Sequence, residues 1–186
     1  MKHTLPLLAL VAAASAQTAP ASGLNYDLLS VSRHQRQNTV AIQATLKDTN
    51  FVVGAVTSND NQTEGADSQI NIGYIFKNVT NGIDATVGVS QTSYDATVYS
   101  VVLRRQWNEA YQGLEISAGY AGTLSSQNEA DFSFGGTTGD GAKTLTYVEL
   151  AYNVNKTFAV AVSLVKPDSE ANDKDRGTVF TVRAGF

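Results

Sequence analysis

Apolar and polar residues alternate along most of the chain after residue 23, and this two-residue period is typical of β-strands. The alternating stretches are about 8 to 12 residues long and are separated by residues that favour turns. The same region contains no apolar run of about 20 residues, the length that a transmembrane helix needs. The pattern predicts strands at 24–34, 38–47, 51–58, 69–77, 82–92, 96–107, 111–122, 143–154, 156–165 and 177–186.

The two faces of these predicted strands carry different residues. In 156–165, large apolar side chains alternate with Ala159, Ala161 and Ser163, and the stretch 83–90 repeats the pattern. A soluble barrel would place its large apolar side chains inside and would expose Lys and Glu, but the second face here is mostly Gly, Ala, Ser, Thr and Asn. Small residues suit a narrow lumen. We therefore expect the large apolar face to point to lipid.

A sheet that faces lipid has to close, because hydrocarbon offers no partner to the backbone groups of a free edge. The pattern thus predicts an all-β fold, a closed antiparallel up-and-down transmembrane β-barrel of about ten strands, and counts of eight to twelve also fit. Short connections such as 47–50 alternate with longer ones such as 121–143. Aromatic residues near the short turns are Phe51, Phe76, Trp107, Tyr111, Tyr152 and Phe186, and those near the longer loops are Tyr94, Tyr99 and Tyr120.

The first 16 residues have the pattern of a secretory signal peptide. Lys2 and His3 precede an apolar run, and Ala14-Ser15-Ala16 forms a cleavage pattern of small residues. We expect 1–16 to be removed, 17–23 to be a flexible lead-in, and 24–186 to form the barrel domain.

The composition narrows the function further. Charged residues make up 16% of the chain, cysteine is absent and the net charge is -4. An acidic chain is a poor partner for nucleic acid, because phosphate binding needs a basic surface. Without cysteine there are neither disulfides nor thiolate metal sites.

The opening GLNYDLLSVS, the hairpin ATLKDTNFVVGAV and the ending FTVRAGF resemble the small bacterial outer-membrane β-barrel proteins, the porin-like and opacity-like group. The resemblance implies a monomer in the bilayer of a Gram-negative outer membrane. It also implies that the barrel assembly machinery recognises the terminal aromatic strand. The residues that would form this assembly signal are Phe180, Val182, Ala184 and Phe186.

Four charged residues are predicted to meet in the lumen. Arg104 and Glu115 flank the turn at 108–111 and would stand directly opposite each other if the hairpin were symmetric, while Glu149 and Arg183 also face inward. The network would be either a charged constriction that selects solutes or a structural filling of the interior. We favour the filling, because about eight strands leave an interior just wide enough for side chains.

Arg105 is the exception to this pattern, because alternation points it towards lipid. It lies close to Trp107 near a strand end, where a long side chain can extend to the interface.

No catalytic constellation is recognisable. His34 is the one histidine after the signal peptide, and because no acid is placed to orient it, we expect a solvated loop residue. We therefore predict no enzyme activity, no catalytic residues and no cofactor.

Two stretches have a composition that could bind a ligand, phosphate in one case and Ca²⁺ in the other. The Gly-rich stretch 132–141 lacks the phosphate-loop pattern and is expected to be a mobile loop with an aromatic tip. The loop at 168–175 is acidic enough for Ca²⁺, but its carboxylates lack EF-hand spacing and basic residues are interleaved, so we expect a solvated loop and no metal. Its carboxylates are Asp168, Glu170, Asp173 and Asp175.

These observations favour an integral outer-membrane barrel that has a structural or narrow-pore role and no catalysis. The alternative is a surface adhesion or interaction protein that acts through its extracellular loops. A further alternative is a soluble periplasmic barrel with its apolar faces inward around an apolar ligand.

Overall fold

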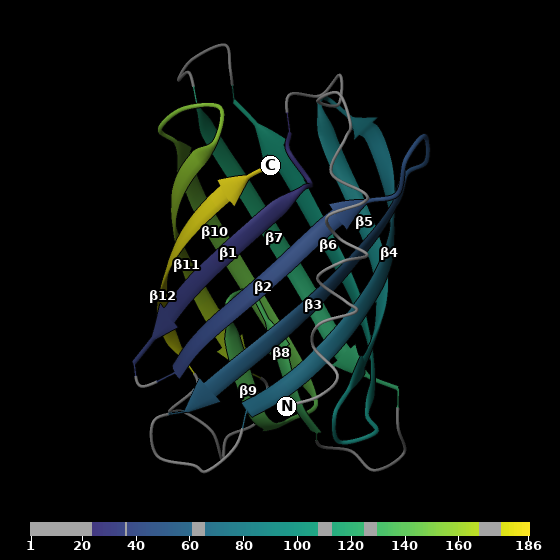
Figure 1. The fold of residues 1–186 in the computed structure, drawn as a ribbon, viewed down its shortest axis with the longest axis vertical. Helices are drawn as coiled ribbons and strands as arrows, with labels where there is room; N and C mark the ends of the chain where they lie inside the picture. Colours follow the sequence, from purple (N-terminus) through teal and green to yellow (C-terminus); the bar gives the residue numbers. More distant parts are fainter. Residues whose placement is uncertain (1–23, 36, 61–65, 108–112, 125–129, 168–175) are drawn as a thin grey trace.

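The computed structural model describes residues 24–35, 37–60, 66–107, 113–124, 130–167 and 176–186, and nearly all of them lie in strands or tight turns. The ten predicted strands are confirmed, and two further strands, β8 and β9, are present (Figure 1). The strands are β1 (Leu28–His34), β2 (Gln37–Thr45), β3 (Phe51–Asp60), β4 (Ala66–Thr80), β5 (Ile83–Thr92), β6 (Thr97–Gln106), β7 (Leu114–Thr123), β8 (Ala130–Phe134), β9 (Thr137–Ala142), β10 (Thr144–Asn153), β11 (Phe158–Pro167) and β12 (Gly177–Gly185).

Ten strands close into an antiparallel barrel in the order β1-β12-β11-β10-β7-β6-β5-β4-β3-β2. The barrel closes between its first and last strands, where Leu29 pairs with Ala184 and Val31 with Val182. Each remaining neighbour in the ring is the next or previous barrel strand in sequence. The predicted class, a closed up-and-down barrel, is therefore confirmed. Within the described residues, no helix is long and apolar enough to cross a membrane.

Side-chain exposure alternates along the strands as predicted. On β11, Val162 is 44% exposed and Leu164 is 64% exposed, whereas Ala161 is 4% exposed and Ser163 is fully buried. Large apolar residues thus cover the outside of the barrel, and small or polar residues line the inside. The alternative with inward apolar faces is wrong, because its core positions are the exposed ones.

The barrel has two distinct ends. The short-turn end carries the connections 46–50, 81–82, 107–113 and 154–157, and the long-loop end carries the other connections. The C-terminus lies at the short-turn end, which is uppermost in Figure 1.

Exposed aromatic side chains mark both ends. At the short-turn end, Phe51 and Phe76 pack edge-on against Tyr74. At the long-loop end, the ring centroids of Tyr99 and Tyr120 are 5.9 Å apart.

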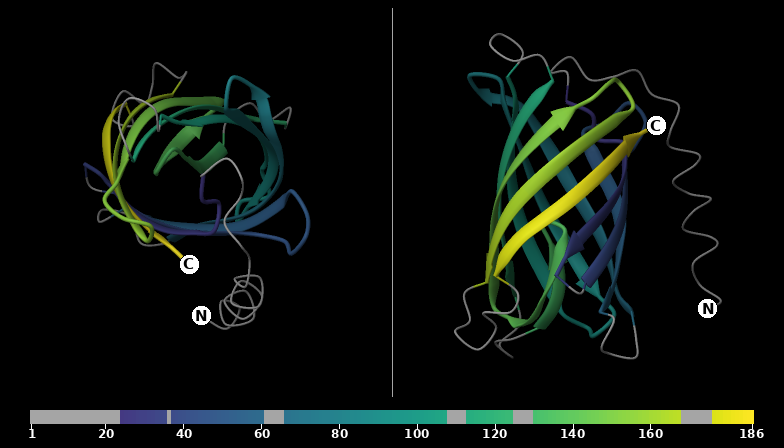
Figure 2. Two further views of the ribbon diagram at one scale, coloured as in Figure 1. Left: turned by 90° about the horizontal axis from the view of Figure 1, so that it is seen from above. Right: turned by 90° about the vertical axis from the view of Figure 1, so that its left-hand side faces the viewer.

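The 124–143 connection departs from the prediction. The stretch 132–141 was expected to be a mobile loop, but it belongs to the β8–β9 hairpin, which folds into the ring of barrel strands (Figure 2). The turn places Gly135 at φ 64° and Gly136 at φ 87°, a conformation that glycine adopts without strain. The hairpin therefore has a defined place inside the lumen.

Candidate functional site: the lumen and the segments at its two ends

The lumen contains a cavity of about 250 Å³. Inward-facing hydroxyl, amide and glycine positions of β1 to β6 line it together with apolar side chains such as Val52, Val56 and Val102, and residues of β7, β10, β12 and the hairpin complete the wall. Residues 24–27 border it at the short-turn end through Tyr26, and the hairpin borders it at the long-loop end through Ser133 and Phe134.

The first of these boundaries is the strap, defined as residues 24–27. These residues were predicted to begin the first strand, but β1 begins at Leu28. The strap turns inward instead, because Leu24 and Tyr26 bury their side chains against Val52 and Ile75. This apolar cluster lies at the short-turn end of the lumen.

Hydrogen bonds from the barrel wall fix the strap. The Gln43 side-chain amide donates to the Tyr26 carbonyl at 2.9 Å, and the Arg104 guanidinium donates to the Asn25 carbonyl at 3.1 Å. The Asp27 carboxylate accepts from both the backbone N–H and the hydroxyl of Thr45, at 2.6 and 2.8 Å. The strap is thus bound through backbone and side-chain groups.

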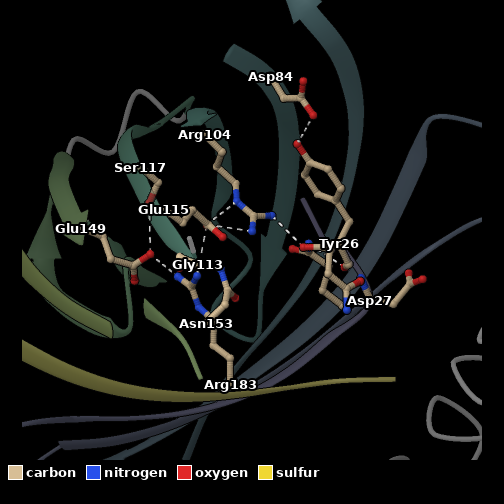
Figure 3. A network of polar contacts seen from close by, with 12 residues as sticks. Tyr26, Asp27, Asp84, Arg104, Gly113, Glu115, Ser117, Glu149, Asn153 and Arg183 are labelled. Carbon is tan, nitrogen blue, oxygen red and sulfur yellow. Dashed lines mark hydrogen bonds and ion pairs between the residues drawn. The ribbon is translucent and has the colours of Figure 1, made fainter. Parts of the chain in front are cut away.

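Tyr26 connects the strap to a buried acid. Its hydroxyl donates to Asp84 at 2.9 Å, and the other oxygen of Asp84 accepts from the Asn78 amide at 2.8 Å. The Arg104 guanidinium lies 4.7 Å from the centre of the Tyr26 ring, within cation–π range. Burial, assisted by the Asp84 charge, raises the pKa of Tyr26 above its ordinary value. The phenol is therefore held in its neutral, donating form (Figure 3).

The structure brings the four predicted lumen charges together (Figure 3). Arg104 contacts Glu115 at 2.8 Å, and Arg183 contacts the same Glu115 oxygen at 3.3 Å. A second guanidinium nitrogen of Arg183 pairs with Glu149. Glu115 is therefore shared by two guanidinium groups, and the chain of ion pairs runs from β6 through β7 to β12 and β10.

Hydroxyl groups complete the environment of Glu149. Ser117 and Ser163 each donate to one of its oxygens at 3.0 Å. Both carboxylate oxygens of Glu149 thus have partners although the side chain is buried.

The predicted register of this pair of strands was wrong by two residues. Arg104 stands opposite Ser117, and Glu115 stands opposite Gln106, so Arg104 reaches Glu115 diagonally. The assumed symmetric turn at 108–111 is replaced by a longer connection, 107–113, which moves β7 along β6. Both side chains nevertheless keep their inward direction because a two-residue shift preserves the face.

The second boundary is the β8–β9 hairpin, which is held mainly by apolar contacts. Phe132 is 1% exposed and packs among small and branched residues of the wall and of β9. The Phe134 ring meets the Tyr147 ring edge-on at 5.1 Å. The buried partners of Phe132 are Val98, Ala121, Ala142, Leu145, Val165 and Val179.

The wall opposite Phe134 is shaped to receive it. A Cβ at Gly119 would lie 2.8 Å from Phe134 and would overlap the Tyr147 ring as well. Polar contacts add direction, because the Ser133 amide donates to Gln69 at 2.9 Å and the Thr137 hydroxyl donates to Gln37 at 2.8 Å. The hairpin is thus docked on the wall on more than one side.

His34 is not the solvated residue that was expected. It is 2% exposed, and its Nδ1 lies 3.1 Å from the Thr178 carbonyl oxygen, inside the long-loop end. The two-residue period already placed it on the same face as Ser32, whose hydroxyl contacts that of Thr181 at 2.8 Å. The short turn after β1 does not expose it because the side chain points into the barrel.

The remaining predicted residues are placed as follows. Phe180, Val182 and Phe186 are exposed on the outside, and Ala184 is half-buried; their role in assembly stays a prediction. Arg105 lies with its guanidinium 5.4 Å from the Trp107 ring centre. The predicted signal peptide 1–16, the predicted lead-in 17–23 and the acidic stretch 168–175 fall outside the described residues. Among the residues that are described, no group of acidic or histidine side chains could hold a metal ion.

No protein-family model matches the chain, and neither does any curated protein. Solved structures of similar fold include a NanC porin (TM-score 0.49, 13% identity, 86% of this chain and 97% of that one) and a KdgM porin in complex with disordered oligogalacturonate (0.48, 13%, 86% and 98%). A third is the outer membrane protein Omp33 of Acinetobacter baumannii (0.45, 11%, 88% and 100%).

Proposed function

We propose that this chain is an integral outer-membrane β-barrel that provides a narrow pore for small solutes and has no catalytic activity. The exposed apolar surface supports the membrane location. It covers the outside of every barrel strand and is flanked at both ends by aromatic side chains, as in transmembrane β-barrels. Water around such a belt would be unfavourable, since isolated patches on soluble proteins are far smaller.

The observation that carries the pore is the open cavity between the strap and the hairpin. A purely structural barrel of this size would fill its interior with side chains. Here about 250 Å³ of the interior is left open, and hydroxyl, amide and charged groups border it together with apolar side chains. The strap narrows one end of the lumen and the β8–β9 hairpin narrows the other. Passage of a solute therefore depends on these two inserted segments.

Membrane fractionation, followed by solute entry into proteoliposomes, tests this function. We expect the protein in the outer-membrane fraction, with heat-modifiable migration on gels, and slow entry of small solutes into liposomes that contain it. Recovery of the protein in the soluble periplasm without detergent would contradict the location. Liposomes as tight with the barrel as without it, even after removal of the hairpin, would contradict the pore.

A further inference from the structure

The uncharged part of the cavity wall offers hydrogen-bonding groups of both kinds. Hydroxyl groups donate and accept, and side-chain amides do the same through separate atoms. These groups come from strands on both sides of the barrel closure, so they surround a solute and do not form a single patch. They include Ser30, Thr86, Ser90 and Ser100. Thr39, Gln43, Asn71 and Thr181 also border the cavity, and one atom of each already bonds to Ser58, the Tyr26 carbonyl, Gln69 and Ser32, respectively.

The charges on this wall cancel. Arg104, Arg183 and Glu149 border the cavity, and Glu115 lies directly behind them as the shared partner of both guanidinium groups. The two positive and two negative groups have no net charge. Asp84 does not border the cavity, and its two oxygens are already bound to Tyr26 and to the Asn78 amide.

Because the wall charges are paired with one another, entry into the cavity is unfavourable for a charged solute. A charge that leaves water for a confined site has to find a counter-charge there. Either sign of solute would have to break an existing ion pair to obtain one, whereas a neutral polar solute would only exchange hydrogen bonds with water for hydrogen bonds with the wall.

Aromatic rings also border the cavity, with Tyr26 at the strap, and Phe134 and Tyr147 at the hairpin. Small-molecule sites commonly combine aromatic surfaces with a few directed polar groups. The cavity volume of about 250 Å³ lies below the usual range for drug-sized ligands. A ring-shaped solute with one apolar face and several hydroxyl groups matches all of these features.

We propose that the lumen selects neutral, hydroxyl-rich solutes of about monosaccharide size, and that the ion-pair chain of Arg104, Glu115, Arg183 and Glu149 is the selectivity determinant. The inference rests on the proposed pore function and extends it by naming the class of solute. The ion pairs act by removing net charge from the wall, and the hydroxyl and amide groups bind the solute.

Two single substitutions should change the sign of the selectivity in opposite directions. Glu149→Gln leaves Arg183 sharing Glu115 with Arg104, so the wall becomes positive and should favour an anion. Arg183→Gln leaves Glu149 with only the hydroxyl groups of Ser117 and Ser163, so the wall becomes negative and should favour a cation. The double variant Glu149→Gln/Arg183→Gln restores zero net charge and is the matched control.

The experiment compares glucose, glucuronate and glucosamine, which share a ring and differ in charge. Binding is measured by ligand-observed NMR on the refolded full barrel in detergent, and permeation by liposome swelling. For the unsubstituted protein we expect several-fold preference for glucose over both charged sugars. The preference should move to glucuronate in Glu149→Gln and to glucosamine in Arg183→Gln, and should return to glucose in the double variant. Heat-modifiable migration checks that each variant is folded.

Failure of the inference is distinct from failure of the pore. Three results would overturn the selectivity and leave the pore function intact. They are permeation of all three sugars at equal rates, a preference of the unsubstituted protein for a charged sugar, and a preference that neither substitution changes. Binding of glucose with the predicted reversals, but without permeation, would overturn the pore and support the site. If no sugar binds and none permeates, both are overturned.

Discussion

The two ends of the lumen are narrowed by segments of different chemistry. At the short-turn end, the strap is fixed by hydrogen bonds to Gln43, Thr45 and Asp84, and it adjoins the ion pairs of Arg104. At the long-loop end, the hairpin buries Phe132 in an apolar cluster and bonds to the wall through Ser133 and Thr137. The strap combines apolar burial of Leu24 and Tyr26 with directed hydrogen bonds and nearby charges, whereas the hairpin depends more on shape and on the burial of Phe132.

The two regions differ in how much the folding of the barrel depends on them. The ion pairs join β6, β7, β10 and β12, so they belong to the barrel itself, and removing one charge leaves another buried without its partner. The hairpin is a separate two-stranded sheet inserted between β7 and β10 in sequence, and it contacts the wall through apolar packing and the hydrogen bonds of Ser133 and Thr137. We therefore expect the hairpin to be dispensable for folding and the ion pairs to be important for it.

Replacing the β8–β9 hairpin, 130–142, by a short Gly/Ser linker should have the largest effect on permeability. The partners of β7 and β10 in the barrel do not change, so the barrel should fold, while the long-loop end of the cavity opens. Single-channel conductance in planar bilayers should rise several-fold. A Gly/Ser segment of the full original length is the control for loop length, and a variant that stays as tight as the parent would show that the strap alone limits passage.

Glu115→Gln should have the largest effect on stability. Both Arg104 and Arg183 lose their shared carboxylate, and breaking a buried ion pair from one side costs about 3–5 kcal/mol. Urea unfolding of the refolded barrel measures the loss. Asp95→Asn, at an exposed turn, is the control and should change stability by less than about 0.5 kcal/mol.

A double substitution tests whether the broken ion pair causes this loss of stability. Adding Arg104→Gln to Glu115→Gln removes the guanidinium group that has lost its carboxylate partner, because Arg183 keeps Glu149. The double variant should therefore recover part of the lost stability. If the double variant is as unstable as the sum of the single variants, the ion pair is not the source of the cost.

The sequence predicts which side chains of a barrel strand face the lumen better than it predicts their partners on the next strand. The period of two assigns inward and outward positions from residue type alone, which is why 156–165 and the four lumen charges were placed on the correct faces. The partner across a strand pair depends on turn length as well. The connection after β6 is longer than the sequence suggested, and so Arg104 was assigned the wrong opposite residue.

Segments that insert into the lumen are harder to predict, because their residue pattern is that of a barrel strand or of a loop. Residues 24–27 continue the alternation of β1, and only tertiary packing against Val52 and Ile75 turns them inward. The hairpin left only a partial signal. Gly135 and Gly136 mark a turn after Phe132 and Phe134, but 137–142 contains Gly139, Asp140 and Gly141, residue types that are depleted in strands. Asp84 was likewise on the predicted inner face, but its partner Tyr26 had been assigned to a strand.

Gly119→Ala should have an intermediate effect that is confined to the hairpin. The added Cβ would press on Phe134 and Tyr147, and overpacking costs up to about 3 kcal/mol. Because the barrel strands are held by continuous pairing, the hairpin should move and the barrel should not. Hydrogen exchange at the Ser133 amide, which is bound to Gln69 in the docked hairpin, reports this displacement.

Removal of the opposing ring tests the cause. Phe134→Ala in the Gly119→Ala background gives the new methyl group and the Tyr147 ring room, so exchange at Ser133 should slow again relative to the single variant. If Gly119→Ala instead lowers the unfolding midpoint of the whole barrel and leaves Ser133 protected, the hairpin is not the yielding element.

Tyr26→Phe should have the smallest effect, and it tests the strap. The ring stays buried, but Asp84 loses the phenol donor, at a cost of about 1 kcal/mol in holding the strap. The raised pKa of Tyr26 means that the docked strap favours the neutral phenol. This contribution is complete below the ordinary tyrosine pKa of about 10 and is lost as the pH rises through the raised value. Since the chain has no cysteine, a fluorophore on Asn25→Cys can report strap release. The label should report release at alkaline pH with Tyr26 and not with Phe at this position, while equal release in both would show that apolar burial alone holds the strap.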